Sequence, residues 1–144
     1  MRTIKFRGQC TSYSQYAGEW VTGGVVICEK TNNVLIISAI TDKVTCTYHV
    51  KSETVGQFTN LTDCEGNEIY DGDIIESGKG VRHVIKWNAE RAAWGAFPPC
   101  GALPPWDPGD YGITQSWLIE FGKKVIGNIH DNKDLMQEYN KQIS

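Results

Sequence analysis

The sequence lacks the apolar segments that would place a chain in or across a membrane. Its longest apolar run covers residues 34–40, whereas a membrane-spanning helix needs about twenty apolar residues. Met1 to Arg7 contain no apolar stretch of the kind that signal peptides carry. These absences predict a cytoplasmic protein with no membrane partner.

The sequence also has little that could hold a metal. It contains three histidines, no His-x-His pair and no Cys-x-x-Cys pair, so the zinc-ribbon signature is absent. An odd number of cysteines without an export signal predicts reduced thiols. We therefore expect no metal, no cofactor and no disulfide framework from Cys10, Cys28, Cys46, Cys64 and Cys100.

Catalytic patterns are missing as well. Gly23-Gly24 lacks the Lys-Ser/Thr pair of a phosphate-binding loop. Acidic residues recur between Asp63 and Asp73, but not in the order of a calcium-binding EF-hand loop. They are interpreted as turn residues, with a hard-cation site as the alternative. We expect no catalytic residues; a hydrolase or nuclease would need a cleft that joins His83 or His130 to Asp73.

The charge is nearly balanced, with 14 Lys and Arg against 17 Asp and Glu, for a net charge of -3. Residues 1–50 carry five basic and three acidic side chains, and residues 51–144 carry nine and fourteen. Neither half has the strong positive field of a nucleic-acid binder. Nucleic acid thus remains an alternative partner that net charge does not support; Arg82, Lys86 and Arg91 are the candidate phosphate contacts.

Strand signals dominate what is present, so the predicted class is mainly β with minor α. In residues 1–50 we expect a β-meander lobe, with strands near 2–7, 20–27, 34–40 and 43–50. Gly23-Gly24 predicts a bend or bulge in the second strand. Alternation over residues 43–50 predicts that Cys46 is buried and His49 faces water.

Residues 51–68 are interpreted as a connecting segment, in which Ser52 caps one helical turn and polar turns follow from Thr59 to Asn67. Residues 69–130 are expected to form the second β lobe. There, a glycine hairpin at residues 78–80 joins two strands, and further strands are predicted at 116–121 and 124–130. Strand, glycine turn and strand ending in an aromatic residue indicate a small SH3-like barrel.

The last residues, 131–144, are predicted to form an amphipathic helix. Its apolar stripe would pack on a sheet or on a second copy, through Leu135, Met136, Tyr139 and Ile143.

All five prolines lie between Pro98 and Pro108, so residues 97–111 are predicted to form a long loop. Aromatic side chains beside polyproline can grip a peptide or stack on bases. The candidate binding residues are therefore Trp94, Phe97, Trp106 and Tyr111. Alternatively, these rings fold back onto the lobe.

Several segments together resemble one protein family. They are Met1 to Arg7, Gly18 to Gly23, Val55 to Asp63 continued by Gly66 to Ile75, and Val125 to Asn132. In this order the segments are similar to the motifs of the YopX family, over almost the whole chain. The resemblance implies one YopX-like domain over residues 1–144, encoded by a phage or prophage and acting in a bacterial host. It implies no reaction, cofactor or catalytic residue.

The central family motif has a structural interpretation, in which glycines serve turns and apolar residues pack. Its residues are Gly56, Gln57, Phe58, Thr59, Leu61, Asp63, Gly66, Ile69, Tyr70, Gly72 and Asp73. In the alternative interpretation, Gln57, Thr59, Asp63 and Asp73 line a binding surface. The preferred hypothesis is a non-enzymatic phage accessory protein that acts by protein binding or self-assembly. Its partner would be a host protein, a phage protein or a second copy.

Overall fold

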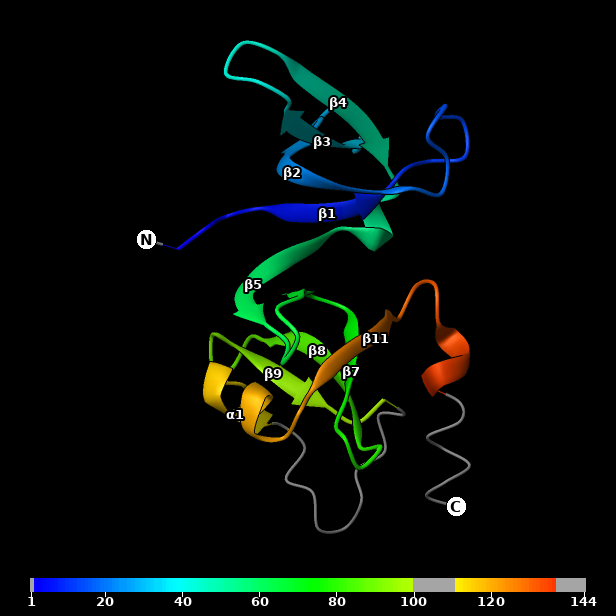
Figure 1. The fold of residues 1–144 in the computed structure, drawn as a ribbon. Coiled ribbons are helices and arrows are strands. Elements are labelled where there is room, and N and C mark those ends of the chain that lie inside the picture. Colours follow the sequence, from blue (N-terminus) through cyan, green and yellow to red (C-terminus); the bar gives the residue numbers. More distant parts are fainter. Residues whose placement is uncertain (1, 100–110, 137–144) are drawn as a thin grey trace. The chain divides into compact units, whose positions relative to one another are not determined.

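The computed structural model describes residues 2–99 and 111–136 and confirms a mainly β protein (Figure 1). The chain divides into an N-terminal unit, Met1–Phe58, and a C-terminal unit, Thr59–Ser144. The boundary falls inside the predicted connecting segment. That segment includes a strand, β5 (Gly56–Thr62), which pairs with β1 at Gly56 and Gln57 and continues into the C-terminal unit.

The N-terminal unit is an antiparallel sheet in which the two halves of β2 pair with different strands. The strands are β1 (Phe6–Gln9), β2 (Trp20–Ile27), β3 (Val34–Ala39) and β4 (Thr45–Val50). The first half of β2 pairs with β1 and the second half with β3, and the change falls at the predicted Gly23-Gly24 site. A Cβ at Gly23 would collide with the carbonyl oxygen of Ile37, so only glycine fits there.

One corner of this sheet is fastened where the ends of β1 and β4 meet. Cys10 and Val50 form a β-bridge, and the Lys51 amide donates to the Gln9 carbonyl over 2.8 Å. A Cβ at Gly8 would lie 3.0 Å from Val50 Cβ, so glycine permits this approach. The sheet is thus curled but joined at a single corner.

A short 3-10 helix, η1 (Ser52–Thr54), connects β4 to β5. The prediction that Ser52 caps it is wrong: Lys51 occupies the N-cap position, and no side chain caps the turn. Thr54 fixes the turn instead, because its hydroxyl donates to the Lys51 carbonyl and accepts from the Gln9 amide.

The C-terminal unit contains an open five-stranded sheet in the order β10-β9-β8-β7-β11. Its strands are β7 (Asp73–Glu76), β8 (Arg82–Asn88), β9 (Ala93–Phe97), β10 (Tyr111–Gly112) and β11 (Lys124–Asn128); β6 (Glu68–Tyr70) lies beside β5. The predicted glycine hairpin joins β7 to β8. Among the described strands β10 and β11 do not pair with each other, so the SH3-like barrel predicted for residues 69–130 is wrong.

The strand predicted at residues 116–121 is also wrong, because this segment forms the helix α1 (Gln115–Glu120). The Thr114 hydroxyl accepts a hydrogen bond from the Trp117 amide over 3.1 Å and caps the helix. Leu118 points into the core with Ile69, Ile75, Ile85 and Ala96. Trp117 packs against the same cluster, so two apolar side chains hold this short, capped helix against the sheet (Figure 1).

The predicted terminal helix is described only in part. Residues 133–136 are helical, and the remaining residues of the predicted stripe, Tyr139 and Ile143, lie outside the described residues. The Arg82 guanidinium donates to the Leu135 carbonyl over 3.0 Å. This bond ties the helical turn to β8.

Candidate functional site

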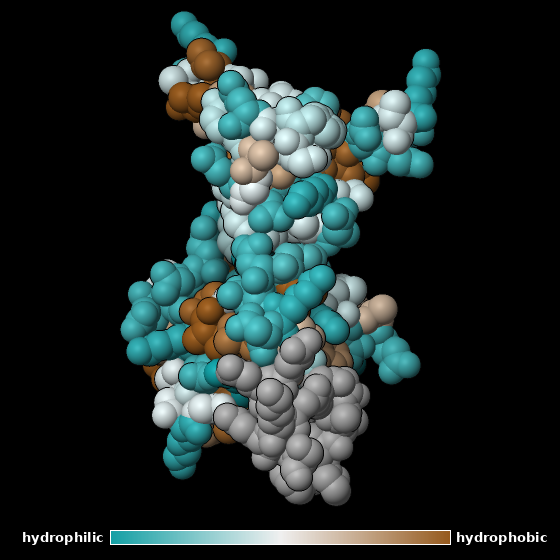
Figure 2. Space-filling model, turned by 90° about the vertical axis from the view of Figure 1, so that its right-hand side faces the viewer, coloured by the Kyte–Doolittle hydropathy of each residue, from teal (hydrophilic) through white to brown (hydrophobic). Residues whose placement is uncertain are grey.

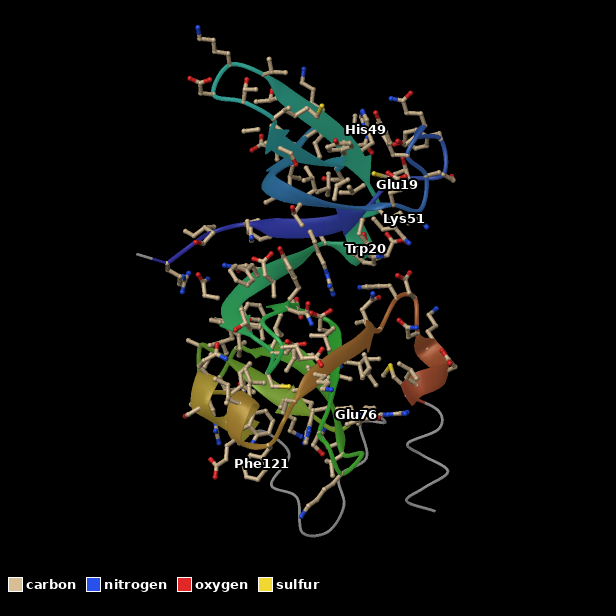
Figure 3. All side chains as sticks on the ribbon, viewed as in Figure 1. Glu19, Trp20, His49, Lys51, Glu76 and Phe121 are labelled. Atoms are coloured by element: carbon tan, nitrogen blue, oxygen red, sulfur yellow. The ribbon has the colours of Figure 1, made fainter. Side chains whose placement is uncertain are left out.

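The most exposed aromatic residue of the described chain lies in the loop between β1 and β2. This tyrosine loop, residues 11–19, is held by backbone hydrogen bonds that include Cys10 N to Glu19 O and Gly18 N to Cys10 O. The Tyr13 side chain is 71% exposed and its ring lies 5.9 Å from that of His49; Tyr16 contacts Tyr48 edge-on at 5.5 Å. Figure 3 shows His49 and Lys51 near the end of β4, beside this loop.

The aromatic contacts follow from the alternation of β4. As predicted, its residues alternate in exposure, and His49 faces water. Cys46 is half-buried rather than fully buried, because the curled sheet covers this face only in part. His49 and Tyr48 project from opposite faces of the strand, so the tyrosine loop places one tyrosine against each face.

The N-terminal unit exposes further large apolar side chains, which reach the surface as brown patches in Figure 2. Ile4 lies just before β1, and Val26 and Ile27 lie at the end of β2. Ile40 and Val44 lie in the hairpin between β3 and β4. These side chains lie at several separate places on the unit. The unit therefore combines a small core with an apolar, aromatic surface.

Most residues of the central family motif serve the fold. Gly66 and Gly72 have φ values of 87° and 90°, which favour glycine. The Thr59 hydroxyl donates to the Ile69 carbonyl over 2.8 Å. Phe58, Ile69 and Tyr70 are buried, Leu61 packs against the core, and Gly56 and Gln57 pair with β1.

The two buried carboxylates of the motif bind backbone amides. Asp63 accepts from the amides of Glu65, Asn67 and Val125 at 2.9 to 3.0 Å and from the Asn67 side chain. Burial acts to raise the pKa of Asp63, but these four hydrogen bonds outweigh it and the pKa is lowered. Asp73 is 1% exposed and accepts from the Tyr70 amide over 2.7 Å. Both side chains fix turns.

The three histidines lie in different surroundings. His49 contacts Tyr13, His83 is buried against Lys123 and Trp117, and the His130 ring lies beside Gly72. In residues 2–99 and 111–136, no three His, Cys, Asp or Glu side chains are grouped closely enough to hold a metal. Cys10, Cys28, Cys46 and Cys64 are not joined in disulfides.

The predicted aromatic surface around the proline segment is only partly described. Trp94 packs against the core and contacts Trp87 edge-on at 5.1 Å. Phe97 lies three residues further along β9, so it points to the opposite face. Trp106 lies outside the described residues, and Tyr111 begins β10 opposite Ala96. The structure therefore does not bring Trp94 and Phe97 together.

The predicted phosphate contacts are also separated. The Arg82 guanidinium pairs with Glu76 at 2.6 Å, and Lys86 is exposed on the same strand. Arg91 is exposed in the turn between β8 and β9. Arg82 is thus committed to an ion pair inside the unit.

One unusual residue has no signal in the sequence. Lys123 is 3% exposed, its ammonium lies 3.4 Å from His83 Nδ1 and 4.8 Å from the centre of the Trp117 ring, and no described carboxylate forms an ion pair with it. Burial lowers the pKa of Lys123 to about 8. Lys123 lies between a turn glycine and another lysine, a context typical of exposed residues. Its burial is therefore seen only in the folded structure.

No helix among the described residues is long and apolar enough to cross a membrane. No curated protein matches the chain.

The chain is similar in structure to protein EF1440 from Enterococcus faecalis. The TM-score is 0.55 at 21% sequence identity, over 93% of this chain and 98% of that one. This similarity shows a shared fold. In addition, residues 5–137 match the family described as YopX protein. Since the match covers most of the chain, the protein belongs to the YopX family.

Proposed function

We propose that this YopX-family protein is a phage or prophage accessory protein that acts by binding proteins, including copies of itself, rather than by catalysing a reaction. The tyrosine loop carries the proposal. It holds Tyr13 and Tyr16 exposed in fixed positions against β4. Tyrosines held rigidly supply contact area at low entropic cost, which suits a binding surface.

The surroundings of the loop support the same function. In the described residues, seven large exposed apolar side chains belong to the N-terminal unit and four to the C-terminal unit, although the N-terminal unit is shorter. The carboxylates of Asp63 and Asp73, which were candidates for a binding surface, accept hydrogen bonds from backbone amides. The family motif thus builds the fold, and the surface for partners lies elsewhere.

The test compares two double variants, each of which replaces two exposed large side chains with serine. Tyr13→Ser with Tyr16→Ser removes the exposed rings of the tyrosine loop; Ile119→Ser with Phe121→Ser removes two exposed side chains of the C-terminal unit. A partner recovered from prophage-carrying cells is purified, and its direct affinity for each variant is measured by calorimetry. We expect at least a tenfold loss of affinity for the tyrosine variant alone.

Equal affinity for the wild type and the tyrosine variant would contradict the proposed surface. Recovery of nucleic acid alone, with an affinity that falls steeply as salt rises, would instead support a nucleic-acid function.

A further inference from the structure

The sheet edges of this protein are protected unequally. Among the described strands, three edge strands carry features that discourage pairing with another chain. The strand β6 has three residues and begins with Glu68, β10 has two residues, and β11 begins with Lys124 and has an irregular register between Val125 and Gly127. The fourth edge, β4, has six residues, Thr-Cys-Thr-Tyr-His-Val, with no Lys, Arg, Asp, Glu or Pro. Its residues favour strands.

Half of the backbone groups of β4 point away from β3. The His49 carbonyl accepts from the Thr11 amide, and the Lys51 amide donates to Gln9, so these odd-numbered residues face outward. Because backbone groups alternate along a strand, those of Thr45 and Thr47 face outward too. Within the described residues, no protein group hydrogen-bonds to the outward amides and carbonyls of these two threonines.

We propose that β4 pairs antiparallel with β4 of a second copy about a two-fold axis, so that Cys46 faces Cys46. This inference rests on the proposed function, since it specifies self-assembly. With Cys46 on the axis, Thr45 and Thr47 of the two copies pair with each other and form four hydrogen bonds. A register centred on Thr47 would require the His49 carbonyl, which Thr11 already occupies.

The side chains are self-complementary in this register. Val44, which is 51% exposed, would face Tyr48 of the second copy, an apolar residue beside an aromatic ring. Thr45 would face Thr47 on the other side of the sheet, and no like charges would meet. Such cross-strand pairs each contribute about 0.2–1 kcal/mol. A contact of this size predicts a reversible dimer of modest affinity.

Sedimentation of the full chain from low to high micromolar concentration tests the pairing. We expect a concentration-dependent dimer for the wild type and a monomer for Thr47→Pro. Proline removes an outward amide that the monomer does not use, and edge strands tolerate this. Thr47→Val keeps the amide and is the matched control, which should still dimerise. Thr45→Lys with Thr47→Lys, which opposes like charges, should also be monomeric.

Oxidative cross-linking tests the register. Directly opposite residues of a non-hydrogen-bonded pair have Cα atoms about 4.5 Å apart, within the range of a disulfide. In a variant with Cys28, Cys64 and Cys100 changed to Ser, diamide should oxidise the two Cys46 thiols to one disulfide, accepting two electrons and two protons. The cross-link should disappear in Cys46→Ser and in Thr47→Pro.

A wild-type chain that stays monomeric, or a dimer that Thr47→Pro leaves intact, would overturn the pairing. A dimer without the Cys46 cross-link would overturn this register. The proposed function fails separately, because loss of partner binding in the tyrosine variant does not depend on β4 pairing.

Discussion

The two units differ in what they do with their apolar residues. Among the described residues, the C-terminal unit buries eight hydrophobic residues, five of them in one cluster that includes Leu118 of α1, whereas the N-terminal unit buries four. The N-terminal unit instead leaves tyrosines, valines and isoleucines at its surface. A unit that exposes apolar area gives up stability that burial would provide. We therefore expect the C-terminal unit to provide most of the stability, and the proposed partner contacts to lie on the N-terminal unit.

The largest expected effect tests where the stability lies. Leu118→Ala empties the centre of the C-terminal cluster and should lower the free energy of unfolding by about 3–4 kcal/mol. Ile36→Ala removes an equally buried side chain from the thinner N-terminal core and should cost about 2 kcal/mol. Urea denaturation followed by tryptophan fluorescence measures both. A larger loss for Ile36→Ala would reverse the comparison.

Asp63→Ala should cost about 2–4 kcal/mol, because it leaves three backbone amides of the C-terminal unit without their acceptor. Glu65→Ala is the control, since that side chain is exposed and forms only a surface pair with Lys124. It should change stability by less than about 1 kcal/mol.

The same carboxylate gives a pH dependence of known sign. The folded-state pKa of Asp63 is lowered below its ordinary value, so the unfolded chain binds the proton first as the pH falls. Its contribution is therefore complete above the unfolded pKa and is lost as pH falls through the folded pKa. When the free energy of unfolding is measured as the pH falls, the loss that Asp63 causes in the wild type should be absent in Asp63→Ala. The same dependence on acid pH in both proteins would contradict the role given to these hydrogen bonds.

Gly23→Ala tests the turn of β2 in the N-terminal unit. A methyl group at Gly23 meets the Ile37 carbonyl, and we expect a loss of about 2 kcal/mol. At the adjacent Gly24 a methyl group meets nothing within 4 Å. Gly24→Ala should therefore stay within about 0.5 kcal/mol of the wild type. Equal effects in thermal denaturation would show that close approach at Gly23 does not govern the sheet.

Lys123→Met should act in the opposite direction and raise stability at neutral pH by about 1–2 kcal/mol, because it removes a buried cation that no carboxylate of the described residues pairs. Between a folded pKa of about 8 and the ordinary 10.5, the unfolded chain retains a proton that the folded chain releases. Stability of the wild type should thus rise with pH across this interval. The rise should be absent in Lys123→Met; its persistence would contradict the assignment to Lys123.

The sequence predicted elements well where one period was clear. The alternation of residues 43–50 correctly placed His49 at the surface, and the glycine hairpin at 78–80 joins two strands as expected. The strand prediction for residues 116–121 failed because the apolar residues at 117, 118, 119 and 121 fit neither the strand period nor the helix period alone. The cap Thr114 was a usable signal, since its hydroxyl accepts from the Trp117 amide three residues later.

The candidate site was harder to predict for physical reasons. Tyr13 and Tyr16 lie in a polar stretch without a period, and their contacts with β4 arise only when the sheet curls at Gly23. The barrel prediction for residues 69–130 failed because hairpin signals are local, whereas closure of a sheet depends on which strands share neighbours. Exposed edges and buried lysines are likewise properties of the assembled sheet.

Amide hydrogen exchange of the full chain at two protein concentrations tests the division of roles most directly. We expect the core amides of Ile75 and Ile85 to exchange slowly at both concentrations, and those of Thr45 and Thr47 to be slowed only at the higher one. Unchanged exchange at Thr45 and Thr47 would contradict the pairing of β4 between two copies. Concentration-dependent protection confined to the C-terminal unit would contradict the assignment of contacts to the N-terminal unit.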